Sequence, residues 1–160
     1  MSLANKILAT TVVGGGLIAG YSYYLKMQRT QAELEVIPDA KIHQVNWDGI
    51  TIKIDLLMKN PTKGSFSIKF PFVKLTYKDN VVGSSQVVNK DIKIPAFGEA
   101  KVEKILVNIP ILSIFSVSSS ILKAVQKNEP LTIKATLITT IDLGLVKIPF
   151  EESHEVTLKK

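Results

Sequence analysis

The sequence predicts an all-β domain, an antiparallel sandwich of about seven strands with one helix, preceded by an N-terminal transmembrane helix. Three observations support this prediction. From residue 41 onward, apolar residues mostly alternate with polar ones, which is typical of strands that bury one face. One later segment instead repeats apolar residues at three and four, as an amphipathic helix does. Residues 7–25 contain no charge and are long enough to cross a bilayer.

The uncharged run at residues 7–25 lies between Lys6 on one side and Lys26 and Arg29 on the other. Tyrosines near the end of such a run are typical of a membrane interface. The residues expected in the membrane are Ile7, Leu8, Val12, Val13, Leu17, Ile18, Tyr21, Tyr23, Tyr24 and Leu25. A cleavable signal peptide is the alternative, but Ala19-Gly20-Tyr21 is a poor cleavage site and the apolar run continues beyond it. The sequence therefore favours an uncleaved single-pass anchor.

A short stalk is expected between the anchor and the domain. We expect residues 1–30 to form the anchor, residues 31–40 the stalk and residues 41–160 the sandwich. The anchor helix should continue for a turn or two beyond the membrane until Pro38 ends it. The domain should therefore lie close to the bilayer. The charges on the two flanks of the anchor nearly balance, which leaves its orientation open.

Two glycines in the uncharged run have a spacing that lets membrane helices approach closely. Gly16 and Gly20 form a G-x-x-x-G pair, so a homo-oligomer that contacts through them is one outcome. The alternative is that they are small residues of a span with no such role. Both remain open at the level of sequence.

The alternation gives the order of the strands. Its apolar positions are Ile50, Ile52, Ile54, Leu56 and Met58, then Phe66, Ile68 and Phe70, then Val73, Leu75 and Tyr77, then Ile105, Val107 and Ile109, then Leu131, Ile133, Ala135 and Leu137. A last strand covers roughly residues 146–158. The phase slips at Pro71-Phe72, which predicts a bulge within one strand.

The predicted helix covers residues 111–127, between Pro110 and Asn128-Glu129-Pro130. Its apolar stripe comprises Ile111, Ile114, Phe115, Ile121, Leu122 and Val125. We expect this stripe to pack against an end or a face of the sheets.

Composition argues against several kinds of protein. The chain has no cysteine, so its fold depends on no disulfide and on no thiolate metal site. The net charge is +6, and the domain after residue 30 carries +3 of it, from 17 lysines against 14 carboxylates. Proteins that recognise nucleic acid rely on arginine for paired contacts to bases and phosphates. Because the domain has no arginine, we expect no specific nucleic-acid partner.

A succession of short motifs resembles a known family. It comprises Asn60-Pro61-Thr62 at the end of a strand, Phe66-x-Ile68-x-Phe70-Pro71, Leu75-x-Tyr77, Val82-Gly83-Ser84-Ser85 and Ile94-Pro95-Ala96-Phe97-Gly98. Over about residues 38–158 the chain resembles the late embryogenesis abundant (LEA) type 2 family, also called the water-stress and hypersensitive-response (WHy) domain. The resemblance implies an immunoglobulin-like sandwich of seven strands with one helix. It also implies a generally non-enzymatic protein, in several members membrane-anchored, linked to stress tolerance or to binding lipids and other partners.

The residues carry no signature of a catalytic, cofactor or metal site. His43 and His154 are expected on the first and last strands, and no set of N, S or O ligands converges on either. Ser118-Ser119-Ser120 lies in the predicted helix, without the strand–turn–helix context of a nucleophile. For Asn60-Pro61-Thr62 we favour turn chemistry over a partner-contact loop. For Trp47 we favour a place at the core edge over an exposed anchor.

The sequence thus predicts a non-enzymatic, membrane-anchored binding or structural module without a cofactor. Its expected partners are the lipid bilayer and another protein, in a role similar to that of stress proteins. The alternative is a minor structural protein of a membrane-containing virus particle, where it would link the bilayer to the capsid shell. The expected location is therefore a cell envelope or the internal membrane of a virion. An enzyme is a third reading, but no group of residues in the sequence forms a site for it.

Overall fold

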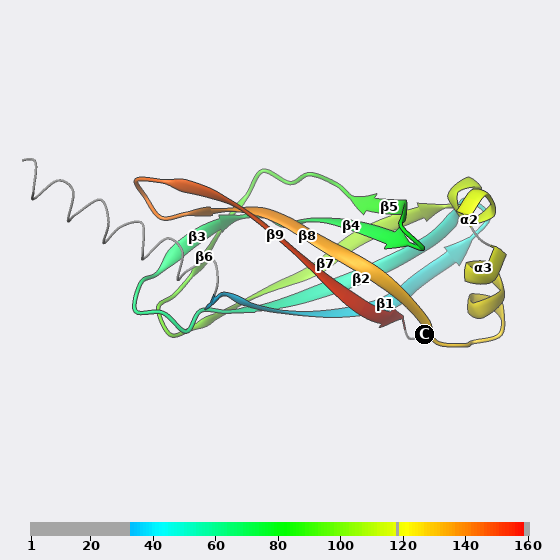
Figure 1. Ribbon diagram of the computed structural model, residues 1–160, viewed down its shortest axis with the longest axis horizontal. Coiled ribbons are helices and arrows are strands. Elements are labelled where there is room, and N and C mark those ends of the chain that lie inside the picture. Colours follow the sequence, from blue (N-terminus) through cyan, green and yellow to red (C-terminus); the bar gives the residue numbers. More distant parts are fainter. Residues whose placement is uncertain (1–32, 118, 159–160) are drawn as a thin grey trace, which may run out of the picture.

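The computed structural model describes residues 33–117 and 119–158, which form nine strands and two short helices (Figure 1). The strands are β1 (Glu35–Asn46), β2 (Gly49–Lys59), β3 (Phe66–Lys69), β4 (Phe72–Tyr77), β5 (Asn80–Ser85), β6 (Asp91–Ile94), β7 (Glu99–Pro110), β8 (Leu131–Asp142) and β9 (Lys147–Leu158). The helices are α2 (Ile111–Val117) and α3 (Ser119–Gln126). The all-β prediction is confirmed. Nine strands stand where about seven were expected; one of the extra strands arises because the strand expected over residues 66–77 is divided into β3 and β4.

One antiparallel sheet folds over to give the two layers of the sandwich (Figure 1). Strands β1, β2 and β7 form one layer, and β4, β8 and β9 form the other, with β3 and β6 continuing it beside one end of β8. Strand β5 pairs with β4 in one layer and with β7 in the other. The layers are therefore joined through β5, and the core lies between them.

Isoleucine dominates that core, as expected for strands, where branched side chains pack well against a pleated surface. The largest fully buried side chains are Ile50, Ile52, Ile54, Met58, Ile68, Leu75, Ile94, Ile109, Ile114, Ile121, Ile133 and Ile141. Many of them are the apolar positions of the sequence alternation. The period of two therefore identified the buried face of the long strands correctly.

Strand β1 begins inside the segment expected to be the stalk. Residues 35–40 pair with β2, and Val36 and Ala40 are buried in the core. Any helical continuation up to Pro38 is therefore wrong over residues 35–37, which are strand. Pro38 is accommodated because β1 pairs with β2 alone, and an outer strand tolerates a residue that has no N–H to donate.

The phase slip at Pro71-Phe72 separates two strands and is not a bulge within one. Strands β3 and β4 both pair with β8, β3 through Ile68 opposite Ile141 and β4 through Val73 opposite Leu137. Between them Pro71 is buried, and it has no N–H to continue a ladder. The prediction located the irregularity correctly and assigned it the wrong kind.

The predicted helix is present as two helices that close one end of the sandwich (Figure 1). Ile114, Ile121 and Val125 of the predicted stripe are buried. Phe115 is exposed, so its assignment to the stripe is wrong. At 3.6 residues per turn, Phe115 falls on the edge of the stripe with Ile111 and Leu122, which are themselves only half-buried.

No helix in residues 33–117 and 119–158 is long and apolar enough to span a membrane. The predicted span at residues 7–25, with Gly16 and Gly20, lies outside the described residues.

The sandwich has two ends with different structures (Figure 1). We call the end at which β1 begins the proximal end. It holds the loop of residues 60–65, the turn of residues 95–98 and the β8–β9 hairpin loop of residues 143–146. The opposite, distal end holds α2, α3 and the β1–β2 hairpin loop.

Candidate functional site

Asn60 is the centre of a hydrogen-bond network at the proximal end. It follows β2 directly and is 2% exposed. Its side-chain amide donates to Gly64 O at 2.8 Å and to Pro95 O at 2.9 Å. Its side-chain oxygen accepts from the Thr62 N–H at 3.0 Å and from the Thr62 hydroxyl at 2.6 Å. All four hydrogen-bonding positions of this buried amide are thus satisfied, as the burial of a polar group requires.

The same network fixes the turn of residues 95–98. The Asn60 N–H donates to Gly98 O at 2.8 Å, and the Phe97 N–H donates to Thr62 O at 3.0 Å. The loop of Asn60, Pro61 and Thr62 therefore has the local turn hydrogen bonds expected from the sequence. Asn60 also holds a second loop, 35 residues away in the chain. That longer-range role was not visible in the sequence.

Phe97, at the tip of this turn, combines an unusual backbone conformation with an exposed side chain. Its φ is +49°, and its side chain is 69% exposed. A left-handed backbone costs a non-glycine residue about 1–2 kcal/mol. An exposed aromatic side chain in a strained, well-braced turn suggests a contact with something outside the sandwich.

A second apolar side chain projects from the same end. Leu145 in the β8–β9 hairpin loop is 87% exposed. Strand β3 pairs with the ends of both β6 and β8, through Phe66 with Ile94 and Ser67 with Asp142. Because β6 and β8 both end beside the start of β3, the loops that follow them both emerge at the proximal end (Figure 1). We call Phe97 and Leu145 the proximal apolar tips.

The distal end carries another group of exposed apolar side chains. Trp47 is 97% exposed, so the expectation that it lies at the core edge is wrong. The neighbouring Asp48 accepts a hydrogen bond from the Ile111 N–H at 2.9 Å, which joins the hairpin loop to the start of α2. On α2, Leu112 is 77% and Phe115 is 63% exposed. We call Trp47, Leu112 and Phe115 the distal apolar surface.

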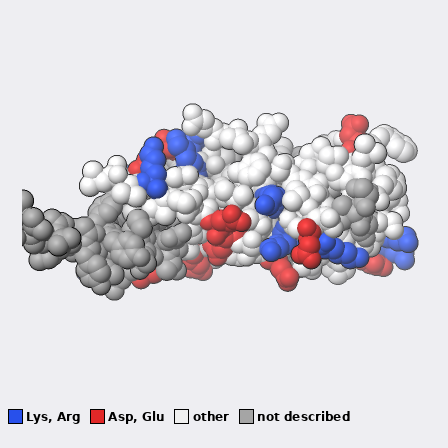
Figure 2. Space-filling model, turned by 45° about the horizontal axis from the view of Figure 1, so that its top comes forward, with Lys and Arg blue, Asp and Glu red and all other residues white. Residues whose placement is uncertain are grey.

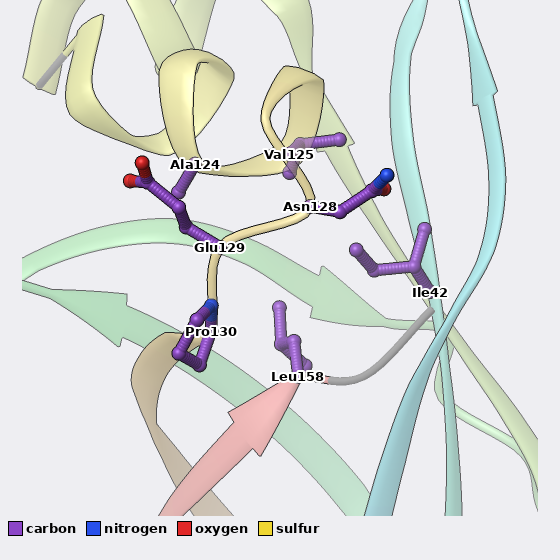
Figure 3. A pocket seen from close by; sticks show the side chains of 7 residues that line it. All are labelled: Ile42, Ala124, Val125, Asn128, Glu129, Pro130 and Leu158. Atoms are coloured by element: carbon purple, nitrogen blue, oxygen red, sulfur yellow. The ribbon is translucent and has the colours of Figure 1, made fainter.

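A pocket of about 210 Å³ lies beneath α3, between the outer strands β1 and β9 (Figure 3). Its lining residues are Ile42, Ala124, Val125, Asn128, Glu129, Pro130 and Leu158. In Figure 3 Ile42 and Leu158 converge on the space from the two strands, while Val125 lies above it on the helix. Pockets that hold drug-sized ligands usually have about 300–1,000 Å³. This pocket is too small for such a ligand.

The two histidines lie on the first and last strands, as expected. His43 is exposed on β1, and His154 is half-buried on β9. His154 Nε2 lies 3.2 Å from Glu152 Oε1, and both side chains are on the inward side of the strand with Phe150 and Val156. Glu152 Oε2 and His154 Nε2 are buried without a hydrogen bond among the described residues. Inward charges on an outer strand oppose pairing with another strand.

No group of three or more His, Cys, Asp or Glu in the described part of the chain could hold a metal ion. In the predicted serine run, Ser120 Oγ lies 3.0 Å from Tyr77 Oη, which ties α3 to β4. Ser118 is outside the described residues.

Asp55 stabilises an irregularity in the pairing of β2 with β7. The register between β2 and β7 shifts beside Asp55, and Lys104 there has a φ of +60°. The Asp55 carboxylate accepts a hydrogen bond from the Lys104 N–H at 2.8 Å and pairs with Lys53 Nζ at 3.0 Å. Burial alone would raise the pKa of Asp55, but these two partners outweigh it and lower that pKa below its ordinary value. The carboxylate thus has a structural role in the bulge.

On the face shown in Figure 2, small groups of Lys and small groups of Asp and Glu lie on a mostly uncharged surface. The exposed ion pairs of the domain include Lys41 with Asp39 at 3.0 Å and Lys69 with Asp91 at 2.8 Å. An electrostatic footprint for nucleic acid would be a basic stripe. This face has none.

The fold and these features define a two-layer β-sandwich with exposed apolar side chains at both ends. A crystal structure of a protein from Archaeoglobus fulgidus is similar, with a TM-score of 0.54 and 12% identity over 79% of this chain and 97% of that one. A solution structure of an Arabidopsis thaliana protein also gives a TM-score of 0.54, with 18% identity over 79% of this chain and 81% of that one. At these identities the likeness shows the fold alone.

A protein provisionally named a late embryogenesis abundant protein aligns with 99% of this chain and 91% of its own, at 16% identity and a TM-score of 0.35, which is too low to carry an argument. No protein-family model matches the sequence, and no curated protein sequence matches it significantly. The comparisons therefore support the fold, and membership of the LEA type 2 family is not shown.

Proposed function

We propose that the protein is a non-enzymatic, membrane-anchored binding module, similar in role to stress proteins, that holds its sandwich close to a bilayer and presents the distal end to a protein partner. One observation carries the proposal. Only nine residues lie between Leu25, where the uncharged run ends, and Glu35, where strand β1 begins. Nine extended residues reach about 30 Å at most. A run that spans a bilayer would therefore keep the proximal end next to the membrane.

The distal apolar surface then faces away from that membrane. Interfaces are enriched in aromatic residues, and tryptophan is prominent among residues whose truncation weakens binding most. Trp47, Leu112 and Phe115 offer such side chains on a rigid end of the sandwich. This supports a protein partner at the distal end and a lipid partner at the proximal end.

Membrane flotation of the full chain tests the anchor. The protein should float with vesicles, resist an alkaline wash and be released by detergent. The double variant Val13→Lys, Leu17→Lys should leave the vesicles, since a charge at the centre of a span costs about 2.5–3.5 kcal/mol. Val87→Lys, at an exposed position of the domain, is the matched control and should still float. Release of the unchanged protein by the alkaline wash would refute the anchor.

The distal partner is tested by capture with purified full chain in vesicles. Proteins retained by the unchanged chain and lost from Trp47→Ala, but retained by Val87→Ala, are its expected partners. Identical retention by all three chains would argue against the distal surface. The alternative, a virion protein that links the bilayer to a capsid shell, uses the same two ends with a shell protein as the partner. Mass spectrometry of purified virus particles separates the two.

A further inference from the structure

We propose that the proximal apolar tips, Phe97 and Leu145, insert into the surface of the bilayer that anchors the protein, so that the sandwich rests on the membrane at two loops. This inference rests on the proposed anchoring. Insertion of the tips would add a second, reversible contact with lipid and would fix the orientation of the sandwich. A flexible tether alone would give neither.

The position of the tips in the fold is the first argument. Glu35 begins β1 opposite Lys59, and Lys59 also pairs with Glu99, the first residue of β7 after the turn that carries Phe97. The described chain therefore starts beside that turn. Only nine residues separate the end of the uncharged run from Glu35, so this end is the one within reach of a bilayer.

Both tips are exposed, and hydrogen bonds hold the turn that carries Phe97 in place. Phe97 and Leu145 are exposed on two loops that both lie at the proximal end (Figure 1). The turn of Phe97 is braced by Asn60, whose buried side chain donates to Pro95 O at 2.9 Å. The backbone of Phe97 is in the left-handed region, which a bulky residue rarely occupies. The fold thus holds an apolar side chain outward in a conformation that is unfavourable for it.

Two lysines lie near the tips, together with the exposed Glu99. Lys63, in the loop next to the Phe97 turn, and Lys93, on β6 just before it, are exposed and form no ion pair within the described part of the chain. Lysines beside apolar side chains are typical of surfaces that lie in the headgroup region, where the apolar groups enter the acyl boundary. This end therefore has both kinds of residue that a bilayer surface contacts.

Single-cysteine labelling of the full chain in phosphatidylcholine vesicles tests the inference, because the chain contains no cysteine of its own. The variants are Phe97→Cys, Leu145→Cys and, as matched controls far from the membrane, Trp47→Cys and Val87→Cys, all at exposed positions. A water-soluble maleimide should label the two proximal cysteines about tenfold more slowly than the controls, each rate normalised to the same variant unfolded in urea. Far-UV circular dichroism of each variant verifies that the sandwich is folded.

A second measurement does not depend on cysteine. Phe97→Trp and Leu145→Trp, each in a Trp47→Phe background, should lose fluorescence in vesicles whose lipid acyl chains carry bromine. Trp47 of the unchanged chain should keep its fluorescence there.

Equal labelling of proximal and distal cysteines in protein that floats with the vesicles would overturn the inference and leave the anchor intact. Protein that fails to float would overturn both. Protection that disappears when the protein is diluted with lipid would identify a second copy of the chain as the occupant and would also overturn the inference.

Discussion

Replacing Asn60 by alanine removes the centre of the network that joins the two proximal loops. Four side-chain hydrogen bonds are lost, two from the amide and two to its oxygen. One partner recovers, because the Thr62 hydroxyl also lies 3.2 Å from Gly64 O and can still donate there. With about 1 kcal/mol for each of the three remaining bonds, the free energy of unfolding should fall by about 3 kcal/mol. For a domain of this size, that corresponds to a decrease in melting temperature of about 10 °C.

The assay is urea unfolding of the full chain in mild detergent, followed by far-UV circular dichroism. Asn89→Ala is the matched control, since this exposed asparagine accepts only one side-chain hydrogen bond, from Lys69 Nζ at 3.3 Å. Its unfolding free energy should change by less than about 0.5 kcal/mol. Thr62→Val removes the hydroxyl and keeps the Thr62 N–H, so it should cost about half as much as Asn60→Ala.

Asn60→Asp separates the donors from the acceptor. It retains an oxygen for Thr62, but it places a carboxylate against the two carbonyl oxygens that the amide served. It should be at least as destabilising as Asn60→Ala at neutral pH and should recover part of the loss in acid, where the carboxyl is protonated. An Asn60→Ala protein as stable as the Asn89→Ala control would show that the network contributes little.

Three further features are tested by substitution, each by the same unfolding assay. Gly49→Ala should cost about 3 kcal/mol or more, because the added Cβ would lie 2.1 Å from Ile109 O, whereas Gly144→Ala has open space and should lose only the smaller cost of its positive φ. The pKa of Asp55 is lowered in the folded protein, so its contribution is present above its unfolded pKa of about 4 and is lost as the pH falls through the lower folded pKa. Unfolding midpoints should therefore fall more steeply in acid for the unchanged chain than for Asp55→Asn, and parallel curves would contradict this. Ile68→Ala, at a fully buried position, should cost about 2–5 kcal/mol, while Leu145→Ala should change stability by less than about 0.5 kcal/mol; similar losses for both would contradict the assigned core.

The long strands could be predicted from the sequence because burial on one face imposes a period of two. Ile50, Ile52 and Ile54 alternate with polar residues and are buried as expected. Strand β1 was missed over residues 35–40, since Pro38 indicates a break whether it ends a helix or lies on an outer strand. The difference depends on whether a neighbouring strand needs its N–H, which is a property of the tertiary fold.

The ends of the sandwich were less predictable than its strands. Trp47 and Phe97 are large and apolar, so burial was the simpler assignment for Trp47, and nothing in the local pattern marks either residue as exposed. The inward pair of Glu152 and His154 could have been found. Consecutive strand residues face opposite sides, but residues two apart share a side, so Glu152 belongs with His154.

The course of β1 determines how a mechanical load would pass through the molecule. This strand starts at the proximal end and finishes one residue before Trp47. A force applied between the bilayer and a partner bound at Trp47 would act along the β1 backbone. This backbone is already extended over about 40 Å, so it could lengthen very little. A partner held at α2 would instead load the β1–β2 and β2–β7 ladders lengthwise, where the cross-strand bonds share the force. In both cases the sandwich would transmit the tension with little change in its length.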